Sequence, residues 1–85
     1  MSDDELTKLR DEIRGIDRHL VELPAQRLDL ARRVGEIKRA GGLPIRNYVV
    51  EAEAIHLVRD AAMQLRVDPD VAEELLKLEI RESLR

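Results

Sequence analysis

A single stretch, SDDELTKLRDEIRGIDRHLVELPAQRLDLARRVGEIKRAGG (residues 2–42), carries the clearest pattern in this chain of 85 residues. Its apolar residues recur in steps of three and four, which is the periodicity of an amphipathic α-helix. They are Leu6, Leu9, Ile13, Ile16, Leu20, Leu23, Leu30, Ala31, Val34 and Ile37. Ser2 and Glu5 form a capping-box pattern at the start, and Gly41-Gly42 is a stop signal. We therefore expect one helix of about 38 residues, roughly 55 Å long.

Two shorter helices are expected after this stretch. Asn47 is suited to cap a helix that runs to about Leu65, and Asp68 is suited to cap another that has Pro69 at its first position. No segment alternates in the way that a β-strand does. The sequence predicts an all-α protein with one long and two shorter helices, in a single domain over residues 1–85.

Composition limits the function. Charged residues make up 39% of the chain with a net charge of -3, and this balance lacks the basic stripe of a nucleic-acid binder. There is no cysteine, and His19 and His56 lack the spacing of metal ligands, so neither a disulfide nor a metal site is expected. No apolar run reaches the roughly 18 residues of a membrane span. We expect a cytoplasmic protein that binds neither membranes nor nucleic acid.

The long helix has more apolar surface than the short helices can cover. Helices of roughly 18 and 16 residues each reach along only half of it, yet its apolar stripe continues from end to end. An intertwined homodimer, in which a second copy covers the remainder, is favoured over a monomer. A long coiled coil is the other alternative, but the stripe is not a strict heptad.

Pro24 is the residue that fits this scheme least well. In mid-helix it removes the hydrogen bond to the Leu20 carbonyl, at a cost of about 3 kcal/mol. Either the helix kinks at Pro24 or it breaks near Leu23. The apolar periodicity continues in phase beyond the proline, which favours a kink.

Arg27 and Lys38 are cations on an apolar face. Eleven residues separate them, which places them about 20° apart around an ideal helix and about 16 Å apart along it. A charge that faces the interior needs a counter-charge, so the pair predicts an anionic ligand. The alternative is that both side chains extend to solvent or pair with nearby glutamates.

Three further residues are candidates for the same site. Arg10 lies about 25 Å from Arg27 along the helix, so it could reach this site only from the second chain of an antiparallel dimer; otherwise it is a surface residue. Glu51 is in the first turn of the second helix and in line with inward-facing residues, or it is simply paired with Arg46. Ser83 faces inward on the last helix and could donate a hydrogen bond.

Taken together, several segments resemble the all-helical class of chorismate mutase. They are Leu9–Ile13, Ile16-Asp17, Ala25–Arg27, Val34–Lys38 and Pro44–Arg46, and the spacing of Arg10, Arg27, Lys38 and Glu51 is the specific part. The resemblance implies a homodimer with two shared sites that convert chorismate to prephenate in aromatic amino-acid biosynthesis, without a cofactor. By the same resemblance Lys38, Arg27 and Glu51 are catalytic, and Arg10, Arg46, Asn47 and Ser83 bind the substrate.

The sequence also departs from this family. Asn47 stands where an aspartate is common and would offer only a neutral acceptor, and Val50 replaces a frequent arginine. A glutamine or glutamate that helps Lys38 would fall about two residues after Arg85, so impaired activity is expected. Two alternatives are an enzyme similar to isochorismate–pyruvate lyase and a non-catalytic dimerisation or regulatory module of the same fold.

Overall fold

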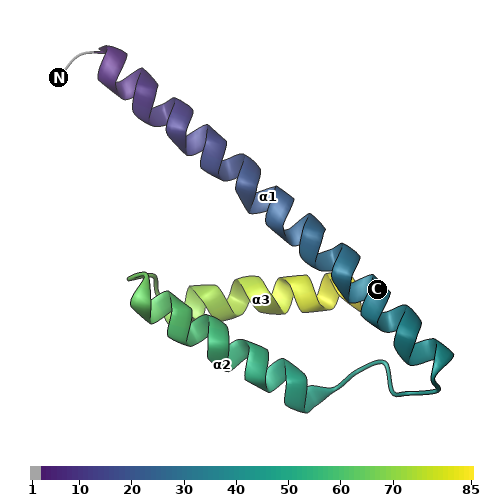
Figure 1. The fold of residues 1–85 in the computed structure, drawn as a ribbon. Coiled ribbons are helices and arrows are strands. Elements are labelled where there is room, and N and C mark those ends of the chain that lie inside the picture. Colours follow the sequence, from purple (N-terminus) through teal and green to yellow (C-terminus); the bar gives the residue numbers. More distant parts are fainter. Residues whose placement is uncertain (1–2) are drawn as a thin grey trace.

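The computed structural model describes residues 3–85 as three helices, and this part of the chain contains no strand. Helix α1 spans Asp3–Ala40, α2 spans Tyr48–Gln64 and α3 spans Pro69–Ser83 (Figure 1). The predicted fold class of one long and two shorter helices is confirmed. Helix α1 continues through Pro24, so of the two alternatives the break near Leu23 is excluded. The proposed cap Ser2 lies outside the described residues.

Local sequence explains where the helices begin. The side-chain oxygen of Asn47 accepts hydrogen bonds from the backbone N–H groups of Val49 and Val50 at 3.1 and 3.2 Å, and so caps α2. Asp68 accepts from the Asp70 N–H at 2.9 Å, with Pro69 at the first position of α3. Both predicted caps are therefore present.

Helices α1 and α2 end in the same type of turn. After α1, the Leu43 N–H donates to the Lys38 carbonyl at 2.8 Å and Gly42 has φ 66°. After α2, the Val67 N–H donates to the Ala62 carbonyl at 2.8 Å and Arg66 has φ 59°. Both are Schellman motifs, in which one residue adopts the left-handed conformation that glycine tolerates best. The left-handed residue is Gly42 in the first turn and Arg66 in the second.

The three helices are arranged around α3. Helix α3 runs back alongside α2, and its C-terminal end lies against the C-terminal half of α1, whose N-terminal half extends away from the other helices (Figure 1). The buried residues among those described are Ala62 on α2 and Leu76 and Ile80 on α3. This small core fixes the end of α3 beside the residues of α1 that include Arg27 and Lys38.

An ion-pair cluster joins α2 to α3. The Arg59 guanidinium donates to Asp70 at 2.8 Å and to Glu73 at 3.1 Å, and Lys77 pairs with Glu73 at 2.7 Å. Hydrogen bonds to Asp70 and Glu73 raise the pKa of Arg59, and the bond to Asp70 has the larger effect. The pKa of Glu73 is lowered, chiefly by its bond to Lys77. The cluster fastens the hairpin at the end remote from α1.

The chain is much more open than a compact monomer of its size. Its radius of gyration is 17.0 Å, against about 12 Å for a compact chain of this length. It exposes 7371 Å², whereas a compact monomer of this mass exposes about 5,200 Å². On the projecting half of α1, Ile13, Ile16 and Leu20 are 55%, 59% and 59% exposed. None of the helices in residues 3–85 has the length and apolarity needed to cross a membrane.

Candidate functional site

A cleft of about 620 Å³ lies where the C-terminal half of α1, the start of α2 and the end of α3 meet. Its volume falls in the range of small-molecule sites. It brings together five of the seven predicted site residues: Arg27 and Lys38 from α1, Asn47 and Glu51 from the N-cap and first turn of α2, and Ser83 from α3. The apolar part of its wall includes Leu30, Ala31, Val34, Ile45, Val50, Ile80 and Leu84.

Arg27 and Lys38 both occupy the face of α1 that the cleft uses. Between Arg27 and Lys38 the half-buried positions of α1 are Arg27, Leu28, Ala31, Gly35 and Lys38, and all but the adjacent Leu28 follow steps of three and four. Lys38 Nζ donates to the Ile45 carbonyl at 3.3 Å, which leaves two of its three N–H donors for a ligand. Within residues 3–85, Arg27 makes no ion pair or hydrogen bond with another side chain. Both cations are available to an anion in the cleft.

Glu51 lines the cleft, but its carboxylate is bound by Arg46, which lies outside the cleft. Arg46 Nε donates to one carboxylate oxygen at 2.9 Å, and Arg46 Nη2 donates to the other at 3.0 Å. The Glu51 side chain is 20% exposed and that of Arg46 is 46% exposed. The Arg46 guanidinium also lies over the Tyr48 ring, 4.6 Å from its centroid. Its pKa is raised, chiefly by the hydrogen bond to Glu51.

Both interpretations of Glu51 therefore describe one arrangement. The predicted pairing with Arg46 is present, and the carboxylate also faces the cleft. Arg46 itself does not line the cleft. It lines a neighbouring hollow of about 550 Å³ together with Leu78, Arg81, Glu82, Leu84 and Arg85.

Asn47 presents a donor to the cleft. Its side-chain oxygen already accepts two backbone N–H groups, which uses both lone pairs of an amide carbonyl. These two bonds also decide which atom of the amide is oxygen. The expected neutral acceptor is consequently committed to capping α2, and the NH₂ group is the part of Asn47 that remains for a ligand.

Ser83 is half-buried and lines the cleft, and its hydroxyl donates to the Ile80 carbonyl at 2.8 Å. To donate to a ligand, this hydroxyl must turn away from its own helix. Val50 also lines the cleft and contributes apolar surface there.

Cations outnumber carboxylates around the cleft. Its lining includes five cationic residues, Arg27, Arg32, Lys38, Arg39 and Arg85, and two acidic ones, Glu36 and Glu51. The chain as a whole has a net charge of -3. A local excess of positive charge on an acidic protein favours a small anionic ligand. No group of three or more potential metal ligands occurs in the described residues.

Sequence reasoning missed some of these residues. Arg32 and Arg39 lie on α1 beside the apolar face rather than on it, so periodicity gave no signal for them. Arg85 reaches the cleft only because the end of α3 packs on α1.

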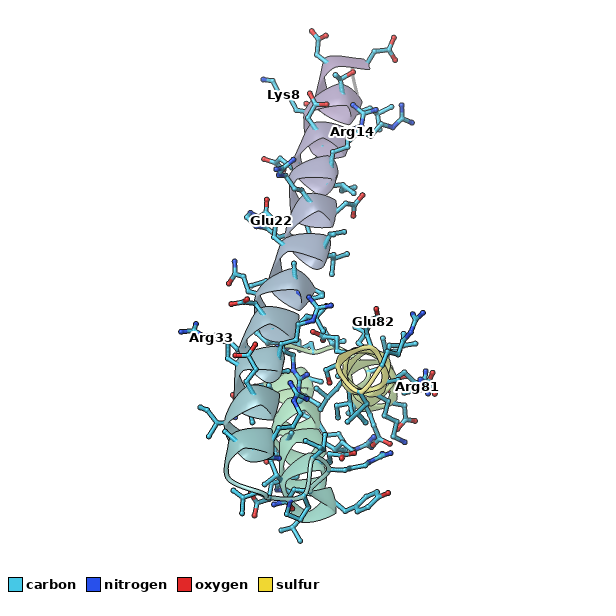
Figure 2. All side chains as sticks on the ribbon, turned by 90° about the vertical axis from the view of Figure 1, so that its right-hand side faces the viewer. Lys8, Arg14, Glu22, Arg33, Arg81 and Glu82 are labelled. Carbon is cyan, nitrogen blue, oxygen red and sulfur yellow. The ribbon has the colours of Figure 1, made fainter. Side chains whose placement is uncertain are left out.

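Arg10 is not among the residues that line the cleft. It lies in the projecting half of α1 and is exposed. The side of α1 away from α3 is polar, as Lys8, Glu22 and Arg33 show (Figure 2). Within one chain, the structure does not bring Arg10 to Arg27 and Lys38.

Comparison with known proteins supports the predicted family. The chain is 48% identical over 81 residues to a T-protein of Enterobacter agglomerans, an alignment that covers 93% of this chain and 21% of that protein. It is 37% identical over 78 residues to a T-protein of Haemophilus influenzae, covering 92% of this chain and 21% of that protein. The chain thus spans about a fifth of the length of these curated relatives. No solved structure matches.

The strongest finding concerns the family. Residues 9–85 match the family described as chorismate mutase type II. This match includes α1 from residue 9 onward, all of α2 and α3, and every residue that lines the cleft. The resemblance inferred from the sequence is confirmed: the chain belongs to the type II chorismate mutase family.

Proposed function

We propose that this chain is an isomerase that converts chorismate to prephenate. The observation that carries the proposal is the joint placement of Arg27, Lys38 and Glu51 in one cleft, with two half-buried cations on a single helix face. Membership of the type II chorismate mutase family supports it. The substrate is a charged intermediate of aromatic amino-acid biosynthesis, which is our reason for also proposing a cytoplasmic location.

The reaction suits a cationic cleft. It is a unimolecular [3,3] rearrangement of a dianion, in which an ether C–O bond breaks while a C–C bond forms, with no proton transfer and no redox change. The protein must hold two carboxylates, select the compact conformer and stabilise negative charge on the ether oxygen. Because the electrons only move within the substrate, the proposal requires no cofactor.

The two half-buried cations have different tasks in this mechanism. The guanidinium of Arg27 can bind a carboxylate through two parallel hydrogen bonds. The ammonium of Lys38, already oriented by the Ile45 carbonyl, is proposed to meet the ether oxygen. A fixed charge in a partly dry site stabilises a transition state in which charge develops. We therefore assign Lys38 to the chemical step. Arg27 is assigned to the chemical step and also to binding of the substrate.

The hydroxyl of the substrate is proposed to lie against the start of α2. A hydroxyl can donate one hydrogen bond and accept others. Glu51 offers an acceptor, and Asn47, the N-cap four residues before it, offers the donors of its NH₂ group. Ser83, near the end of α3, is proposed to assist one carboxylate. Asn47 would therefore act on the substrate hydroxyl as a hydrogen-bond donor, whereas an acceptor was expected at this position.

We also propose that the active form is a homodimer in which Arg10 of the partner chain completes each site. The excess of exposed area over a compact monomer is about 2,200 Å² per chain, and a typical interface buries about 800 Å² per partner. The exposed apolar residues of the projecting half of α1 provide the surface. An antiparallel pairing of α1 helices would carry each Arg10 toward the opposite cleft.

The direct test is to incubate the purified chain with chorismate and follow ultraviolet absorbance. Formation of prephenate above the uncatalysed rate supports the proposal. Release of pyruvate from isochorismate would instead indicate a lyase. Binding of a bicyclic diacid mimic of the transition state without turnover would indicate a ligand sensor, and no binding would indicate an assembly module.

A further inference from the structure

We propose that Arg46 is a positioning residue that acts through Glu51 and does not touch the substrate. This inference rests on the proposed function of the cleft. It changes the role predicted for Arg46, which was substrate binding. The two carboxylate bonds of Arg46, at 2.9 and 3.0 Å, point at Glu51, and Arg46 is absent from the residues that line the cleft.

The geometry of the pair fixes the carboxylate. One bond from Nε and one from Nη2 form a fork that prevents the carboxylate from rotating. Each Glu51 oxygen keeps one further lone pair, so the residue can still accept a hydrogen bond from a ligand. The fork therefore orients Glu51 without using all of its acceptor capacity.

The pair also keeps Glu51 away from the cations of the cleft. Arg27 and Lys38 share the cleft with this carboxylate, and Arg27 makes no ion pair within residues 3–85. A carboxylate released from Arg46 would be attracted to one of them. Such a pair would neutralise a cation that the dianionic substrate needs. Arg46 holds Glu51 at the wall and leaves both cations to the ligand.

Tyr48 restricts the guanidinium from its other side. Its ring centroid lies 4.6 Å from the central carbon of the Arg46 guanidinium, a cation–π distance. Arg46 precedes α2 and Tyr48 begins it, so the stack joins the loop to the helix that carries Glu51. The order of contacts from solvent to cleft is Tyr48, Arg46 and Glu51.

A double-mutant cycle distinguishes a positioning role from direct binding. The proteins are the wild type, Arg46→Gln, Glu51→Gln and the double variant. For each, kcat and KM for chorismate, the Kd of the bicyclic diacid mimic and the melting temperature are measured. Arg46→Gln is expected to lower kcat/KM about tenfold in the wild-type background, because groups in one hydrogen-bonded network are strongly coupled. In the Glu51→Gln background it is expected to change kcat/KM by less than about twofold.

Two further variants serve as controls. Arg46→Lys keeps the charge but loses the fork, so it is expected to fall between the wild type and Arg46→Gln. Arg33→Gln removes the same charge from the side of α1 away from α3, and its kcat/KM should stay within about twofold of the wild type (Figure 2). If Arg46→Gln unfolds the chain, the Arg46→Lys cycle replaces it.

Equal losses from Arg46→Gln in both backgrounds would overturn the proposal, since Arg46 would then act on the substrate itself. An Arg46→Gln protein with wild-type kcat/KM would overturn it as well. A wild-type protein that neither forms prephenate nor binds the mimic would refute the proposed function, and with it this inference. The first two outcomes leave the proposed function intact, so the failures are distinguishable.

Discussion

Arg27 and Lys38 lie on the same half-buried face of α1 and line the same cleft, although neither forms an ion pair in the described part of the chain. Burying an unpaired cation costs free energy, and the cost is lower where solvent still reaches the group. A cleft that keeps two such cations outside any ion pair is arranged for an anion that arrives from outside. This relationship connects the apolar periodicity of α1 to the proposed chemistry.

The first prediction concerns assembly. We expect a solution mass of twice 9.8 kDa under native conditions, because the projecting half of α1 exposes an apolar surface that a second copy can cover. Sedimentation equilibrium at micromolar concentration measures it. Ile13→Asp should weaken the association, since a charge would enter that surface. A compact wild-type monomer of 9.8 kDa would exclude the shared site and the role of Arg10.

Pro24 provides a test of the continuous helix. Because α1 runs through this residue, Pro24→Leu restores a helical hydrogen bond and should raise the free energy of unfolding by up to about 3 kcal/mol. Thermal or urea denaturation measures the change. Pro69→Ala is the matched control, since a proline at the first position of a helix gives up no bond and little change is expected. A lower melting temperature for Pro24→Leu would mean that the native chain requires the proline.

Substitutions at the left-handed residues of the two Schellman turns are expected to change stability in opposite directions. Arg66→Gly removes a side chain from a left-handed residue and should stabilise the chain by about 1 kcal/mol. Gly42→Ala places a side chain at the equivalent residue of the first turn and should destabilise the chain by a similar amount, about 1 kcal/mol. Chemical denaturation of both variants decides the matter, and effects of the same sign would contradict the shared geometry.

The cluster around Glu73 predicts a dependence of stability on pH. The pKa of Glu73 in the folded chain lies below the ordinary value of 4.5, chiefly because Lys77 bonds to it and, to a smaller extent, because Arg59 does. The stabilisation is therefore complete above that value and is lost as the pH falls through the lowered pKa. Glu73→Gln should flatten the decline of melting temperature between about pH 5 and pH 3. Glu74→Gln, at an exposed residue without an ion pair in residues 3–85, is the control and should keep the wild-type decline.

Much of this architecture could be predicted because its signals are local. Apolar spacing located α1, and the capping residues Asn47 and Asp68 located the starts of α2 and α3. The inward direction of Arg27 and Lys38 followed from the same spacing. The left-handed Arg66 could not be predicted, because no glycine marks that turn.

Contacts between residues far apart along the chain could not be predicted from the sequence either. The bond of Arg59 to Glu73 spans 14 residues across a turn and leaves no periodic signal. The pairing of Arg46 with Glu51 was only one of two interpretations, since sequence alone does not say whether a carboxylate faces a cleft or a neighbour. The structure shows that Glu51 faces both.

The most direct test of the central claim compares Lys38→Ala with the wild type in the chorismate assay. Lys38→Ala should lose about 10²-fold or more in kcat with a smaller change in KM, because its proposed interaction strengthens as the ether bond breaks. Arg27→Ala should also raise KM, since carboxylates are present in both ground and transition states. Without ligand, Lys38→Ala should melt no lower than the wild type. A Lys38→Ala protein with wild-type kcat would contradict the mechanism.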